Sequence, residues 1–127
     1  MAQTDEQQGF DSPWTGFGVH VVDVAVDQDS GEIGVLRYTA VQETGRMLNP
    51  VGFIGQIEGG LVQSLGTAVM EGLVHDESGR VTNPSFADMK IPTIADIPAL
   101  NTVVLESDDG HGPYNTRGIG EHTNSMA

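Results

Sequence analysis

Runs of apolar residues predict two β-strands in the first third of the chain. Residues 18–27 and 33–43 are both rich in valine and other strand-forming side chains. The polar stretch between them contains Gly31, which can adopt a positive φ, so a β-hairpin is the simplest arrangement. The first run has valines on both faces of an extended strand, Val19 and Val21 on one side and Val22, Val24 and Val26 on the other. Because a strand with two apolar faces is typical of burial, we expect residues 18–27 to lie inside a sheet.

A long helix is predicted over residues 51–72, where apolar side chains recur at helical spacing. The expected core-facing stripe consists of Ile54, Ile57, Leu61, Leu65, Ala68 and Val69. The opposite face is small and polar and consists of Gln56, Gly59, Gly60, Gln63, Gly66 and Thr67. Each interior glycine costs a helix roughly 1 kcal/mol relative to alanine, so we expect a compensating neighbour. Spacing alone favours close packing against another element, and a bound ligand is the alternative.

The rest of the chain predicts shorter elements. They are a second hairpin (73–82), an irregular segment with three prolines (83–99), a strand (100–107) and a Gly/Pro-rich loop (110–121). We therefore predict an α+β fold with a mixed sheet built from hairpins and one long helix with a glycine-lined face. The fold is expected to form a single domain over residues 16–127, preceded by a flexible N-terminal segment, residues 1–15.

The chain is strongly acidic. Five Lys and Arg residues against 18 Asp and Glu residues give a net charge of −13. Such a charge repels nucleic-acid phosphates and anionic lipids, so we expect neither nucleic acid nor a membrane as a partner. The absence of cysteine excludes disulfides and thiolate-bound metal clusters within this chain. No apolar run is long enough to span a membrane and no signal-peptide pattern is present, which leads us to expect a cytoplasmic protein.

Few residues stand out as candidates for chemistry. The four histidines lack any spacing typical of metal ligands, so a metal held by protein side chains is not expected. Nucleophile-elbow and phosphate-binding loop motifs are absent. Glu121 differs because it follows Arg117-Gly118-Ile119-Gly120, where two glycines would let the backbone lie against a ligand. A carboxylate there can serve as a general base if burial raises its pKa, although the residues alone favour an exposed turn.

Several motifs in a fixed order together resemble one family. They are Asn49-Pro50, Gly55-Gln56-Ile57-Glu58-Gly59-Gly60, Gln63-Ser64-Leu65-Gly66, Asn83-Pro84-Ser85-Phe86, Lys90-Ile91-Pro92-Thr93, Gly112-Pro113-Tyr114 and Gly118-Ile119-Gly120-Glu121. Each motif is weak by itself, but their order and spacing over residues 16–121 are highly specific. The chain resembles the C-terminal part of the molybdenum-binding subunit of the xanthine dehydrogenase and aldehyde oxidase family.

The resemblance implies an oxidoreductase that hydroxylates an aldehyde or an N-heterocycle with oxygen taken from water. The molybdenum of such enzymes is held by molybdopterin, a pyranopterin cofactor, rather than by protein side chains. By the resemblance, Glu121 matches the catalytic base, and Gln56 matches a glutamine that contacts the cofactor. Gly59 and Gly60 would then permit close approach of the cofactor, and the helix N-terminus would favour its anionic group.

Two departures from the family pattern affect these expectations. Asn115-Thr116-Arg117 stands where the family often has Gly-Ala-Lys, and His122 stands where a small residue is common, which leaves the substrate open. The family's molybdenum subunits are several times longer than this chain. Glu121 also lies six residues before the last residue, so we expect few neighbours to fix its geometry.

We therefore expect a fragment or small subunit of a molybdenum hydroxylase that is not active alone. Molybdopterin would be shared with a larger molybdenum-subunit chain, iron–sulfur and flavin components would lie elsewhere, and the isolated chain would hold no cofactor. An alternative from a different class is a stand-alone, non-catalytic module descended from that domain. Such a module would form a homo-oligomer through the glycine-lined helix face.

Overall fold

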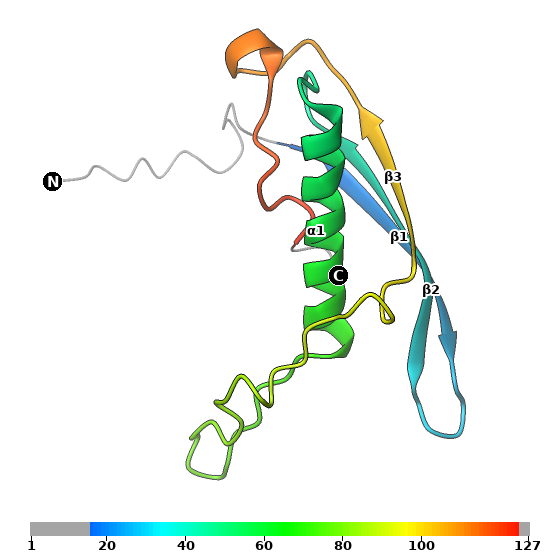
Figure 1. Cartoon of the computed structure of the whole chain (residues 1–127), viewed down its shortest axis with the longest axis vertical. Coiled ribbons are helices and arrows are strands. Elements are labelled where there is room, and N and C mark those ends of the chain that lie inside the picture. Colours follow the sequence, from blue (N-terminus) through cyan, green and yellow to red (C-terminus); the bar gives the residue numbers. More distant parts are fainter. Residues whose placement is uncertain (1–15, 125–127) are drawn as a thin grey trace, which may run out of the picture.

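The computed structural model describes residues 16–124 and has an α+β fold, as the sequence predicts (Figure 1). Its elements are β1 (Gly18–Val26), β2 (Ile33–Glu43), α1 (Pro50–Val69), β3 (Ala99–Leu105) and a short 3-10 turn, η1 (Pro113–Asn115). The three strands form one sheet, and α1 lies against one of its faces (Figure 1). The segment predicted to be flexible, residues 1–15, lies outside the described residues. Within residues 16–124 no helix is long and apolar enough to cross a membrane.

β1 and β2 form the predicted hairpin. The two strands are antiparallel, and Asp27 closes the turn because its Oδ1 accepts hydrogen bonds from the amides of Asp29 (3.0 Å) and Ser30 (2.7 Å). Gly31 has a φ of +75°, the conformation for which glycine was expected in this turn. The hairpin reaches beyond the C-terminal end of α1, so α1 covers only part of it (Figure 1).

β2, not β1, is the central strand of the sheet. The strand order is β1-β2-β3, and β2 and β3 are parallel, so α1 lies in the crossover between them. The expectation that residues 18–27 lie inside the sheet is therefore wrong for the described part of the chain. β1 is an edge strand, and its valines are between 40% and 61% exposed. The valine pattern marks two faces suited to burial, but it cannot reveal how many strands pair with β1.

The hairpin predicted over residues 73–82 stays outside the sheet. It consists of one antiparallel bridge between His75 and Val81, with Gly79 at a φ of +83° in its turn. The following segment, residues 83–98, contains turns and neither strand nor helix, as its prolines predict.

The core lies between α1 and the sheet. Asn49 caps the helix by accepting a hydrogen bond from the Gly52 amide (3.1 Å). The buried apolar cluster consists of Tyr38, Ala40, Phe53, Ile57 and Leu61, with Met47, Leu100, Val104 and Ile119 packed around it. Three members of the predicted helix stripe, Ile54, Ala68 and Val69, are exposed instead. The other three, Ile57, Leu61 and Leu65, are buried as predicted, and Phe53 takes the place of Ile54 at the start of the buried row.

Truncation of the most enclosed helix side chain tests this core. Leu61 is 0% exposed, so Leu61→Ala should lower the free energy of unfolding by about 2–5 kcal/mol through lost burial and a cavity. Val51 is 84% exposed on the same helix, and Val51→Ala should change stability by about 0.5 kcal/mol or less. Urea unfolding followed by circular dichroism measures both. Equal losses of unfolding free energy in Leu61→Ala and Val51→Ala would contradict this orientation of α1.

Candidate functional site

The small, polar face of α1 contacts the segment that carries Glu121. The side-chain amide Nε2 of Gln56 donates a hydrogen bond to the backbone oxygen of Gly120 at 2.7 Å. Figure 1 shows this C-terminal segment running alongside α1, and its Ile119 packs against the core between α1 and the sheet. The structure thus brings Gln56 next to the residue that precedes Glu121, across 64 positions of sequence.

A second contact holds the same segment just after Glu121. Thr123 is 2% exposed, and its Oγ1 donates a hydrogen bond to the backbone oxygen of Ile57 at 3.2 Å. The Ser64 hydroxyl in turn donates to the backbone oxygen of Thr123 at 2.7 Å. Glu121 therefore lies between two points of attachment to α1. These contacts hold the backbone on both sides of Glu121, whereas the expectation that few neighbours fix the carboxylate itself stays a prediction.

Gly60 and Gly59 have different surroundings although they are adjacent. A Cβ atom at Gly60 would overlap with Oγ1 of Thr123, whereas one at Gly59 would meet nothing within 4 Å. Gly66 resembles Gly60, since its Cβ would lie 2.9 Å from Cδ of Pro92. Close packing against another element thus accounts for Gly60 and Gly66. Gly60 faces Thr123 rather than open space, so of these two adjacent glycines it is Gly59 that leaves room for a ligand.

The start of the Glu121 loop is fixed at the far end of β2. The guanidinium of Arg117 forms ion pairs with Glu43 (3.2 Å) and Asp109 (2.9 Å), and its side chain is only 9% exposed. Hydrogen bonds from the Ser107 hydroxyl and from Arg117 hold the pKa of Asp109 below its usual value, so its carboxylate stays ionised opposite the arginine. Sequence reasoning assigned no such role to Arg117. The sequence feature that could have identified Arg117 is the rarity of basic residues, since the very acidic chain has only five Lys and Arg residues.

Glu121 itself is exposed, as are Gln56 and Gly59. These three residues therefore form an open surface rather than a closed pocket. Within the same part of the chain, no three His, Asp or Glu side chains are arranged to hold a metal ion. The surface can therefore offer an amide, a bare helix backbone and a carboxylate to a ligand.

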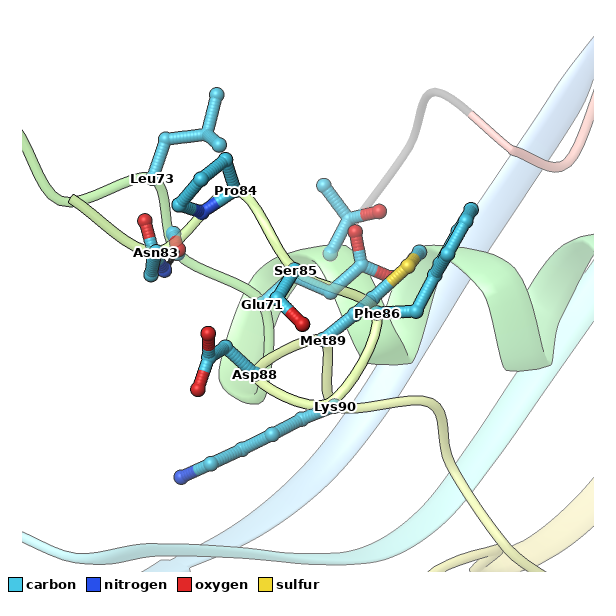
Figure 2. A pocket seen from close by; sticks show the side chains of 11 residues that line it. Glu71, Leu73, Asn83, Pro84, Ser85, Phe86, Asp88, Met89 and Lys90 are labelled. Atoms are coloured by element: carbon cyan, nitrogen blue, oxygen red, sulfur yellow. Dashed lines mark hydrogen bonds between the residues drawn. The ribbon is translucent and has the colours of Figure 1, made fainter. Parts of the chain in front are cut away.

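A hollow of about 530 Å³ lies elsewhere, at the C-terminal end of α1. Its lining includes Leu73, Pro84, Phe86 and Met89 together with Lys90 (Figure 2). Figure 2 shows Phe86 and Met89 extending to one side while Lys90 extends to the other. The hollow begins at Thr67, about 16 Å along the helix from Gln56 at 1.5 Å per residue. It is therefore separate from the surface that contains Glu121.

Comparison with known proteins decides the family. A sequence model of the molybdopterin cofactor-binding domain matches residues 1–98, which is most of the chain. The chain belongs to this family. Its membership confirms the resemblance drawn from the motifs, and the matched range contains Gln56, Gly59 and Gly60, whereas Glu121 lies beyond it.

Relatives of this family are oxidoreductase subunits. The chain is 33% identical over 106 residues to the 6-hydroxypseudooxynicotine dehydrogenase complex subunit gamma of Paenarthrobacter nicotinovorans, covering 83% of this chain and 13% of that subunit. It is 34% identical over 106 residues to the putative xanthine dehydrogenase molybdenum-binding subunit of Escherichia coli, covering 83% and 14%. Among solved structures, reconstituted CO dehydrogenase from Oligotropha carboxidovorans matches with a TM-score of 0.79 at 29% identity, covering 86% and 14%. The chain thus spans only 13–14% of the length of these proteins.

The two adjacent glycines give a matched test of how the loop is held. Gly60→Ala forces Thr123 away from α1 and should lower the free energy of unfolding by roughly 1–3 kcal/mol through overpacking. Gly59→Ala adds a methyl group in open space and should raise it by up to about 1 kcal/mol through better helix propensity. Urea unfolding measures the two changes, and amide hydrogen exchange at residues 121–124 should speed up only for Gly60→Ala. If the two variants changed the free energy of unfolding in the same direction, the contact between Gly60 and Thr123 would be contradicted.

Proposed function

We propose that this chain is the part of a molybdenum hydroxylase that supplies a molybdopterin-contacting helix face and a catalytic base. The reaction is hydroxylation of an aldehyde or an N-heterocycle with oxygen from water. The observation that carries the proposal is the hydrogen bond from Gln56 to Gly120, because it joins the helix face to the loop of Glu121. Membership of the molybdopterin cofactor-binding family supports the same assignment.

The residues present fit such a cofactor. Gln56 uses one amide N–H for Gly120, which leaves the second N–H and Oε1 free to hydrogen-bond a polar edge of the pterin. Gly59 has open space where a side chain would stand, and Gly55, one turn earlier, does too, so a flat ring system can approach the helix backbone. Gly60 serves the site indirectly, by letting Thr123 hold the loop. Molybdopterin, when bound, supplies the redox chemistry of the hydroxylation.

Glu121 acts as the general base in this proposal. A carboxylate accepts the proton that water must lose when its oxygen becomes the nucleophile. The contacts of Gly120 and Thr123 with α1 hold the backbone on both sides of Glu121, which limits where the carboxylate can reach. Its exposure in this chain implies that another part of the enzyme closes the site and shields it from bulk solvent.

The proposal therefore requires partners. The open surface around Gln56 and Glu121 is one side of a pocket, and a larger molybdenum-subunit chain supplies the other sides together with most of the cofactor contacts. Iron–sulfur and flavin components elsewhere in the complex carry the electrons away. The isolated chain is inactive and holds no cofactor, in keeping with its span of 13–14% of the length of its relatives.

Removal of the base tests the proposal in the assembled enzyme. Glu121→Gln keeps the size of the side chain but cannot accept the proton, so turnover should fall by about 100-fold or more. Molybdenum content should stay at the level of the unchanged enzyme, because Glu121 does not hold the cofactor. Steady-state turnover and metal analysis measure the two quantities. Glu77→Gln in the exposed 73–82 hairpin is the matched control, and equal turnover in both variants would remove Glu121 from the reaction.

Removal of the Gln56 amide separates cofactor binding from the chemistry. Gln56→Ala loses the hydrogen bond to Gly120 and the proposed contact to the pterin, each worth about 0.5–1.5 kcal/mol. Molybdenum occupancy of the assembled enzyme should therefore fall, whereas Gln63→Ala, about two turns further along the exposed helix surface, should leave it unchanged. Full occupancy in Gln56→Ala would reduce Gln56 to a residue that only holds the loop.

A further inference from the structure

A row of hydrogen-bonded groups crosses the core from the edge of the sheet to the C-terminal segment. Nδ1 of His20, on β1, lies 3.0 Å from the hydroxyl of Tyr38, on β2. The side chains of Tyr38 and Ser64 are hydrogen-bonded to each other, and the Ser64 hydroxyl donates to the backbone oxygen of Thr123 at 2.7 Å. We call these four residues, His20, Tyr38, Ser64 and Thr123, the polar row.

The polar row is enclosed by the apolar core. Tyr38, Ser64 and Thr123 are buried, and His20 is half-buried. The ring of Tyr38 belongs to the apolar cluster under α1, and the ring of His20 lies edge-on to it, with 5.4 Å between the ring centroids. Water does not replace a hydrogen bond that is lost at such a depth, so each bond of the polar row is costly to break.

The hydrogen bonds of the polar row run in one direction. The backbone oxygen of Thr123 can only accept, so Ser64 uses its single hydrogen there and accepts from the Tyr38 hydroxyl. The oxygen of Tyr38 then accepts from Nδ1–H of His20. Burial lowers the pKa of His20, so its ring is neutral at pH 7 and carries its one hydrogen on Nδ1. Nε2 of His20 is left as an acceptor with no hydrogen-bond partner within residues 16–124.

The polar row ends in the turn that begins at Glu121. The Asn124 amide donates to the backbone oxygen of Glu121 at 3.2 Å, which closes a turn over residues 121–124. Thr123 lies inside this turn, so its hydrogen bond with Ser64 holds the turn on α1. A serine hydroxyl rotates to suit its partners, and donation from Tyr38 leaves the Ser64 hydrogen directed at Thr123. The backbone position of Glu121 thus depends on a side chain of the central strand.

We propose that Tyr38 is a positioning residue for Glu121. It acts through Ser64 and Thr123, and His20 holds the Tyr38 hydroxyl in the orientation that this requires. The inference rests on the proposed function, in which Glu121 is the base. It adds a role for a buried tyrosine hydroxyl, which the apolar packing of the core does not require.

Hydrogen exchange of the full-length chain tests the positioning without the assembled enzyme. Tyr38→Phe keeps the ring and removes the hydroxyl, so the Asn124 amide should exchange about fivefold faster, as expected for the loss of one hydrogen bond. Tyr114→Phe makes the same chemical change at a side chain that is 74% exposed, and it should leave this exchange rate unchanged. Equal exchange of the Asn124 amide in the two variants overturns the proposal.

Turnover of the assembled enzyme tests the consequence for Glu121. Tyr38→Phe should lower kcat by about tenfold and leave KM and molybdenum content unchanged, because it displaces the base and neither binding group. Because Tyr38 acts through Ser64, Tyr38→Phe should cause no further loss of kcat in a Ser64→Ala background. Losses that multiply in the double variant overturn the proposal. A loss of molybdenum in Tyr38→Phe also overturns it, since Tyr38 would then only stabilise the fold.

Glu121→Gln separates a failure of the positioning from a failure of the proposed function. If Glu121→Gln lowers turnover and Tyr38→Phe leaves kcat unchanged, the positioning role fails and the proposed function stands. If Glu121→Gln leaves turnover unchanged, both fail.

Discussion

The geometry of the site depends on the close contact between Gly60 and Thr123. Any side chain at position 60 would occupy the place of Oγ1 of Thr123, so only glycine lets the C-terminal segment lie directly on α1. The contact also satisfies buried polar groups, since the Ser64 hydroxyl and the Ile57 carbonyl find partners in Thr123. A helix glycine costs roughly 1 kcal/mol relative to alanine, and this packing offsets that cost.

Glu121 belongs to a loop that is attached at both ends. Arg117, paired with Glu43 and Asp109, fixes the beginning of the loop to the sheet, and Thr123 fixes its end to the helix. Gln56 adds a third contact at Gly120, directly before the carboxylate. In the proposed role of Glu121 as the base, such support matters because proton transfer is sensitive to small displacements. The sheet and the helix therefore act together to present one side chain.

Local patterns predicted the elements well, and the contacts between them poorly. The bounds of β1, β2 and α1 follow from apolar periodicity and from Asn49 and Gly31 at their ends, which are properties of neighbouring residues. The edge position of β1 and the burial of Phe53 in place of Ile54 depend on which elements meet, and the chain pattern alone does not contain that information. Gln56 and Glu121 were chosen by resemblance to a family. The roles of Arg117 and Thr123 became visible only when the strands and the helix were placed together.

The surfaces left uncovered by this chain are consistent with one arrangement. The amide of Gln56, the open backbone at Gly59 and the carboxylate of Glu121 lie exposed on the helix side, and valines lie exposed across the sheet. The exposed surface on the helix side is the one that the proposed larger molybdenum-subunit chain would cover. The most direct measurement is the molybdenum content, per mole of this chain, of the complex purified from its native host. The account predicts close to one molybdenum per chain together with a larger subunit. A stable chain that carries neither molybdenum nor a larger partner would contradict it.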